Sequence, residues 1–202
     1  MTKSLSVFQP APFGLLEFTG PDRGEFLNRL LSNELILQTG QARSAYLLNV
    51  QGRPVAQFWV FQDATSSWLV CPQELVEVSL GELDKMHFGE KLQMFNRSAD
   101  WKPQMLVGPG REDYLGRILG QIPKNRWSLA ACPKGNWLLC RFPWLASGSD
   151  LLWSPTSLTQ DLPGLTEAQF EHERILAGRP WPSDWGEKTM FLEIAEEHDY
   201  LD

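Results

Sequence analysis

Short strands joined by tight turns, and interrupted by short helices, are the feature that most limits the folds open to this 202-residue chain. Residues 45–49 and 55–61 read as two strands, and Asn-Val-Gln-Gly at 49–52 has the chemistry of a tight turn. Together they predict a β-hairpin. Residues 127–131 and 136–141 predict a second hairpin. Hairpins mixed with helices predict an α+β fold rather than a doubly wound parallel sheet.

Helices are predicted at four places among these strands, and a last helix is predicted over 189–197. Apolar residues at helical spacing indicate helices that begin near residues 22 and 73 and after Gly110. A fourth helix is predicted over 166–177 and ends at Gly178. The order strand, strand, helix, strand after residue 52 suits a ferredoxin-like half.

Charge and composition exclude several classes of protein. The formal net charge of −7 argues against nucleic-acid binding, because phosphate recognition requires a basic face. No apolar run approaches the ~20 residues of a membrane span, and the polar residues 1–6 do not read as a signal peptide. The three cysteines, an odd number without metal-ligand spacing, then indicate reduced core thiols in a cytoplasmic protein.

General catalytic patterns are missing from the sequence. There is no Walker loop and no GxSxG, HExxH or CxxC motif. Gly-Pro-Gly at 108–110 is interpreted as a turn before a helix rather than as an anion site. The three histidines stand apart, so neither a metal site nor a catalytic residue is predicted. The residues alone therefore indicate a pair of α+β domains of undefined function.

Three stretches, in order along the chain, carry a resemblance to a known family. Residues 20–34 (GPDRGEFLNRLLSNE) are similar to the pattern G-x-D…F-L-x-x-x-[ST]-N-D. Residues 47–53 (LLNVQGR) are similar to an L-L-N-x-x-G-[RG] hairpin, and residues 173–180 (ERILAGRP) to an R-[IL]-x-x-G-x-P helix end. The chain thus resembles the folate-binding YgfZ/aminomethyltransferase (glycine-cleavage T-protein) family over nearly its whole length.

The resemblance implies an α+β fold in which an N-terminal lobe and a ferredoxin-like lobe are intertwined around a folate. The lobes are expected at residues 1–46, 47–125 and 126–202, with the last segment returning to the N-terminal lobe. The sequence stops at Asp202, about where YgfZ-like proteins reach a K-G-C-Y-x-G-Q-E motif. That motif and the family's C-terminal β-barrel are therefore expected to be absent.

The resemblance also assigns folate-binding residues. Gln57 takes the position of a T-protein acid on the strand after the hairpin, and a neutral amide can hydrogen-bond but cannot stabilise a developing cation as a carboxylate does. Trp144 takes the place of a pocket tyrosine and can stack on a pterin. Asp150 is the nearest match to a glutamate that grips the pterin N–H groups.

Two further matches and one departure complete the expected site. Arg174 matches a helix arginine near the folate, where a guanidinium suits a carboxylate, although an ordinary ion pair is the alternative. Glu193 matches the glutamate of a P-x-E segment, although a solvated helix face is the alternative. Ser44 stands where T-proteins tend to carry a pocket tyrosine, so an altered pocket is expected.

Three functions follow from the resemblance. The first is a YgfZ-like protein that binds tetrahydrofolate without catalysis, in a family associated with iron–sulfur enzyme maintenance. The second is a tetrahydrofolate-dependent aminomethyltransferase, against which Gln57 and the missing barrel argue. The third is a degenerate interaction module that binds no folate. A folate is thus the expected small-molecule partner, a nucleic acid or a membrane is not expected, and a protein partner or a homo-oligomer stays open.

Overall fold

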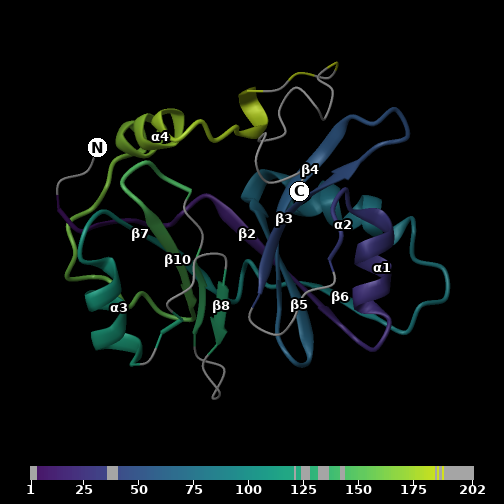
Figure 1. The fold of residues 1–202 in the computed structure, drawn as a ribbon, viewed down its shortest axis with the longest axis horizontal. Coiled ribbons are helices and arrows are strands. Elements are labelled where there is room, and N and C mark those ends of the chain that lie inside the picture. The colour runs from purple at the N-terminus through teal and green to yellow at the C-terminus, as the bar shows by residue number, and fades with distance from the viewer. Residues whose placement is uncertain are drawn as a thin grey trace. The chain divides into compact units, whose positions relative to one another are not determined.

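The computed structural model describes residues 4–35, 41–120, 122–123, 128–131, 137–141, 144–184, 186 and 188. In these ranges the chain forms four α-helices and two five-stranded sheets whose neighbouring strands are all antiparallel (Figure 1). The predicted α+β fold is therefore confirmed, and the described strands form no closed barrel. The chain divides into two compact units, unit 1 (Met1–Pro12 and Ala99–Arg179) and unit 2 (Phe13–Ser98 and Pro180–Asp202).

Unit 2 is built on a sheet with the strand order β3-β4-β5-β2-β6. Its strands are β2 (Phe13–Thr19), β3 (Ala42–Leu48), β4 (Pro54–Gln62), β5 (Ser66–Pro72) and β6 (Gln93–Asn96). Antiparallel pairing of β3 with β4 confirms the first predicted hairpin. At its turn the Asn49 side-chain oxygen accepts the N–H groups of Gln51 and Arg53, both at 3.0 Å.

Two helices of unit 2 pack on one face of this sheet, which we call the helix side. They are α1 (Arg23–Leu30) and α2 (Val76–Asp84), and the short turn η1 (Gln73–Leu75) leads into α2. Apolar side chains from alternate strand positions and from the two helices fill the core between them. Its buried members include Leu16, Phe18, Phe26, Leu27, Ala45, Leu47, Ala56, Phe58, Val60, Leu69, Val76 and Leu83.

The turn between β2 and α1 requires glycine at position 20. Gly20 has a φ of +103°, and a Cβ there would lie 2.3 Å from the carbonyl oxygen of Lys91. Two residues later, the Asp22 carboxylate accepts the Lys91 N–H at 2.6 Å. The Gly-Pro-Asp sequence therefore lets the start of α1 lie directly against the backbone of residues 91–92, just before β6.

Unit 1 is built on a second sheet, with the order β1-β7-β10-β9-β8. Its elements are β1 (Ser6–Phe8), β7 (Lys102–Val107), α3 (Arg111–Leu119), β8 (Ser128–Ala131), β9 (Leu138–Arg141), β10 (Ser149–Ser154) and α4 (Glu167–Leu176). Antiparallel pairing of β8 with β9 confirms the second predicted hairpin. A buried cluster joins α3 to this sheet and contains Leu106, Tyr114, Leu115, Leu139 and Leu152.

Helix α4 has the ends that the sequence predicts. The Thr166 hydroxyl and the Gln169 side chain form a reciprocal capping box at its start. Gly178, with a φ of +66°, follows its end. No helix in the described ranges has the length and apolarity that a membrane span needs.

The divisions between the compact units follow Pro12, Ser98 and Arg179. The lobes expected at residues 1–46, 47–125 and 126–202 stay a prediction. Residue 46 lies inside β3, and its neighbours on both sides pair with β4. Strand β2 also belongs to the unit 2 sheet, because it pairs with β5 and β6. The short helical turn η2 (Pro182–Asp184) belongs to unit 2 as well.

We predict that Gly20→Ala lowers the free energy of unfolding of unit 2 by about 3 kcal/mol, because the substitution adds both a strained φ and a contact with the Lys91 backbone. Urea unfolding followed by circular dichroism measures this loss. Gly81→Ala in α2 is the matched control, since a Cβ there has open space, and it should stabilise the protein by about 0.5–1 kcal/mol. Equal stability of the Gly20→Ala variant and the wild type would contradict the account of this turn.

Candidate functional site

The face of the unit 2 sheet opposite the helix side carries polar and aromatic side chains. Side chains alternate along a strand, so Ser44, Tyr46, Gln57 and Trp59 point away from the helix-side core formed by their neighbours in β3 and β4. We call these four residues the second face. Their exposed fractions are only 0–5%, so this face is as buried as the apolar one.

The antiparallel register brings the four side chains together. Tyr46 lies opposite Gln57, and Ser44 lies opposite Trp59. The Gln57 amide donates to the Ser44 hydroxyl at 3.4 Å. Beside them, Phe13 packs edge-on against Trp59 with ring centroids 5.9 Å apart. An amide–hydroxyl pair is thus set among aromatic rings.

This arrangement suits binding of a flat polar ring better than acid–base chemistry. Aromatic faces can stack on a heterocycle, and the Gln57 amide both donates and accepts hydrogen bonds. None of the four second-face side chains is ionisable near neutral pH, since the tyrosine hydroxyl ordinarily titrates near pH 10. Within the described residues no cluster of three or more histidine, cysteine or acidic side chains could hold a metal ion.

Asp150, a predicted ligand of the pterin, lies in unit 1 between two arginines. Its carboxylate accepts from the Arg141 Nε at 3.0 Å and lies 2.9 Å from the Arg111 Nε. Arg141 also pairs with Glu112 at 2.5 Å. Gly148 makes room for this cluster, because a Cβ there would lie 2.7 Å from the Arg111 guanidinium. Burial raises the pKa of Asp150 above its ordinary value, and the hydrogen bond and charge of Arg141 oppose that rise.

Arg174, another predicted folate ligand, closes the C-terminal end of α4. Its guanidinium makes a two-point contact with Glu171, at 3.1 and 2.6 Å, and donates to the carbonyl of Arg179 at 2.6 Å. These groups are the partners that a basic side chain in the last turn of a helix ordinarily finds. The charge of Arg174 is therefore already engaged within unit 1.

Trp144 begins the loop that enters β10. Its side chain is 1% exposed, and its backbone N–H donates to the Ser149 hydroxyl at 3.0 Å. The same loop is tied to α4, because both the N–H and the hydroxyl of Ser147 donate to the Glu173 carboxylate at 2.8 Å. Trp144 therefore lies in a loop that is closed by its own hydrogen bond to Ser149 and tied to α4 through Ser147.

The predicted folate ligands are thus distributed over both units. Trp144, Asp150 and Arg174 belong to unit 1, Gln57 belongs to unit 2, and Glu193 lies outside the described residues. Their folate-binding roles stay predictions.

Sequence reasoning passed over three buried residues beside the predicted ones. Tyr46 and Trp59 follow Ser44 and Gln57 by two positions, so strand alternation could have identified them. Glu173 gave no such signal, because its partner Ser147 is distant in the sequence.

Two of the three cysteines are buried thiols, as the sequence predicts. Cys71 and Cys140 are free and buried, and burial raises the pKa of both thiols well above the ordinary value. Both sulfurs are therefore held in the protonated, unreactive form at neutral pH. Cys132 lies outside the described residues.

Comparison with solved structures identifies the fold as T-protein-like. The glycine cleavage system aminomethyltransferase T from Bartonella henselae matches with a TM-score of 0.80 and 20% sequence identity, over 89% of this chain and 52% of that protein. This chain therefore spans about half the length of that protein. Heterotetrameric sarcosine oxidase from Corynebacterium sp. U-96 matches with a TM-score of 0.48 and 14% identity, over 75% of each chain. No family model and no curated protein matches the sequence.

We predict that Asp150→Asn lowers the free energy of unfolding by about 3 kcal/mol, because it removes the countercharge that the buried Arg141 and the partly buried Arg111 share. Asp113→Asn is the matched control. Asp113 is exposed in the first turn of α3, so its loss should cost less than about 1 kcal/mol. Thermal and urea unfolding measure both changes. An Asp150→Asn variant as stable as the control would show that this carboxylate is not needed by the fold and is available to a ligand.

Proposed function

We propose that this protein binds a reduced folate, with tetrahydrofolate as the natural form, through the second face of unit 2. The observation that carries the proposal is the Gln57–Ser44 hydrogen-bonded pair set among the rings of Tyr46 and Trp59. The likeness of the fold to an aminomethyltransferase T, over 89% of this chain, supports it. A pterin ring has the flat faces and polar edge that such a surface suits.

Binding without one-carbon transfer is the form of the proposal that the residues favour. Transfer from a folate amine develops positive charge, which a carboxylate stabilises far better than a neutral amide does. Gln57 provides only the amide, and Ser44, Tyr46 and Trp59 add no acid. We therefore assign the chain to YgfZ-like binding proteins rather than to aminomethyltransferases.

The remaining parts of the proposal rest on the resemblance to the YgfZ/T-protein family. The first is that Trp144, Asp150, Arg174 and Glu193 contribute to folate binding. The others are a link to iron–sulfur enzyme maintenance, a protein partner or homo-oligomer, and a cytoplasmic location. Of the four side chains, Asp150 and Arg174 already have close ionic partners. We expect Asp150 and Arg174 to affect folate binding mainly by stabilising the fold of unit 1.

An interaction module that binds no folate is the second candidate, and one observation favours it. The four side chains of the second face are nearly fully buried, so a ligand would reach them only after some local rearrangement. If these four side chains only pack the interior of the protein, the protein will bind no folate.

Titration with 5-formyltetrahydrofolate, followed by calorimetry and tryptophan fluorescence, separates these functions. We expect saturable micromolar binding to the wild type. Gln57→Leu should raise Kd roughly fivefold, which corresponds to the loss of about 1 kcal/mol for one hydrogen bond. Gln62→Leu, at the end of the same strand on the helix side, should bind as the wild type does.

Two outcomes would overturn the proposal. No binding up to millimolar 5-formyltetrahydrofolate would leave the interaction module as the function. Aminomethyl transfer by the wild type, measured with an aminomethylated donor and tetrahydrofolate, would establish the enzyme instead. We expect no turnover, because the charge-stabilising acid is replaced by Gln57.

A further inference from the structure

The loop between α2 and β6 holds an aromatic ring in solvent. Phe88 is 85% exposed and Met86 is 41% exposed. A single exposed apolar residue is ordinary on a protein surface. This loop is distinctive because its backbone is fixed, so the exposed ring does not result from a loose segment.

Glu90 organises this loop. One of its carboxylate oxygens accepts the N–H groups of Phe88 and Gly89 at 3.0 and 3.1 Å, and the other pairs with Arg29 of α1 at 2.5 Å. The Gly89 N–H, with further backbone N–H groups and Arg29, lowers the pKa of Glu90 to about 2. The carboxylate is therefore ionised at neutral pH, and it holds the backbone of Phe88 in place.

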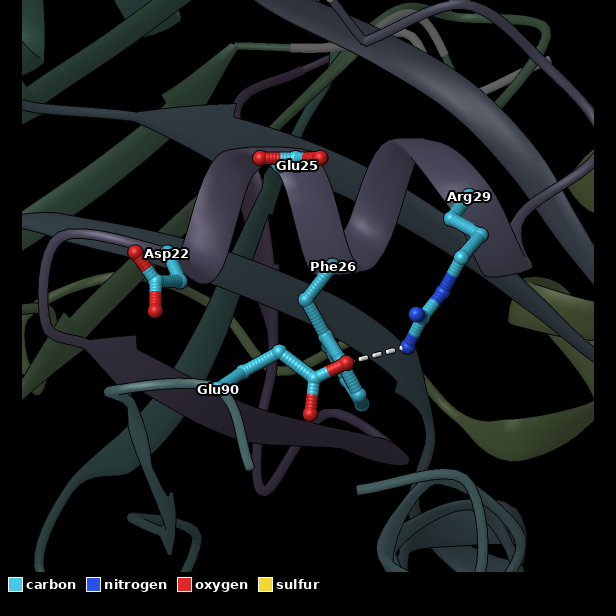
Figure 2. Close-up of a pocket in the computed structure, with 5 residues that line it drawn as sticks. All are labelled: Asp22, Glu25, Phe26, Arg29 and Glu90. Carbon is cyan, nitrogen blue, oxygen red and sulfur yellow. Dashed lines mark hydrogen bonds and ion pairs between the residues drawn. The ribbon is translucent and has the colours of Figure 1, made fainter. Parts of the chain in front are cut away.

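A small cavity of about 220 Å³ lies beside this loop. Figure 2 shows Asp22 and Arg29 toward opposite ends of α1, with Phe26 and Glu90 between them. Asp22, Glu25 and Glu90 contribute three carboxylates to its lining, against the one guanidinium of Arg29. The cavity is smaller than the roughly 300–1,000 Å³ pockets that hold drug-sized ligands, so a side chain is a better occupant than a free metabolite.

We propose that Phe88, Met86 and this cavity form a docking surface for a protein partner of basic and apolar character. The partner offers an apolar socket to the Phe88 ring and a lysine or arginine side chain to the cavity. Exposed aromatic residues on a fixed backbone are favoured anchors at interfaces, because little conformational entropy is lost on binding. The surplus of carboxylates in the cavity determines the charge of the partner.

The net charge of the chain also favours a basic protein partner over other occupants of the docking surface. The chain has a net charge of −7, so a second copy and an anionic lipid surface would both be repelled. The docking surface involves α1 and the loop after α2, which lie on the helix side of unit 2. The second face lies on the other side of the same sheet, so this function is additional to folate binding.

A pair of designed peptides tests the docking surface. One alternates leucine with lysine, and its matched control alternates leucine with glutamate. We expect the leucine–lysine peptide to shift the amide resonances of residues 22–29 and 86–91 in ¹⁵N-labelled protein, and the leucine–glutamate peptide to shift none. Phe88→Ser should raise Kd for the leucine–lysine peptide at least about tenfold, and Glu25→Gln about threefold.

Val50→Ser is the matched control variant, because Val50 is 90% exposed at the tip of the β3–β4 hairpin. It should leave Kd for the leucine–lysine peptide unchanged. The proposal is overturned if this control weakens binding as much as Phe88→Ser does, or if the shifts lie outside the two ranges. It is also overturned if Phe88→Ser instead abolishes self-association in sedimentation experiments or binding to phosphatidylserine vesicles, since a second copy or a membrane would then be the occupant.

Discussion

The antiparallel register between β3 and β4 is the constraint on which the candidate site depends. It places Tyr46 opposite Gln57 and Ser44 opposite Trp59. A slip of β3 by one residue would turn Ser44 and Tyr46 into the apolar core beneath α1 and α2, and would separate them from Gln57 and Trp59. The turn fixes the register, because the Asn49 side chain binds two backbone N–H groups of the residues that follow it. The turn at residues 49–52 therefore determines which side chains of β3 and β4 lie together on the second face.

Unit 1 contains buried, paired carboxylates, whereas the four side chains of the second face in unit 2 are uncharged. Its buried carboxylates, Asp150 and Glu173, are bound by arginines or by N–H and hydroxyl donors of the same unit. Such groups are costly to leave unpaired and are therefore poorly suited to exchange their partners for a ligand. In unit 2 the polar groups of the second face are neutral, and hydrogen bonds between neutral groups are easier to exchange than buried ion pairs. This contrast is why we place the ligand on the second face.

Much of the architecture could be predicted from the sequence, because its signals are local. Turn residues and strand alternation identify both hairpins, and Thr166 and Gly178 mark the two ends of α4. The divisions between the compact units could not be predicted, since β2 joins its sheet through β5 and β6, which lie far from it in the sequence. Local patterns carry no information on such pairings.

The candidate site was predicted less well than the fold, for the same physical reason. Asp150 and Arg174 have the right chemistry for a folate, but the sequence does not reveal that Arg141 and Glu171 already bind them. Gln57 and Ser44 were identified through a resemblance, and strand pairing then explains why they meet.

A crystal structure of the protein with 5-formyltetrahydrofolate tests the central claim most directly. The account predicts a pterin ring against the second face, with the Gln57 amide within hydrogen-bond distance of its polar edge. A pterin ring bound elsewhere on the chain, with the Gln57–Ser44 pair unchanged, would contradict it.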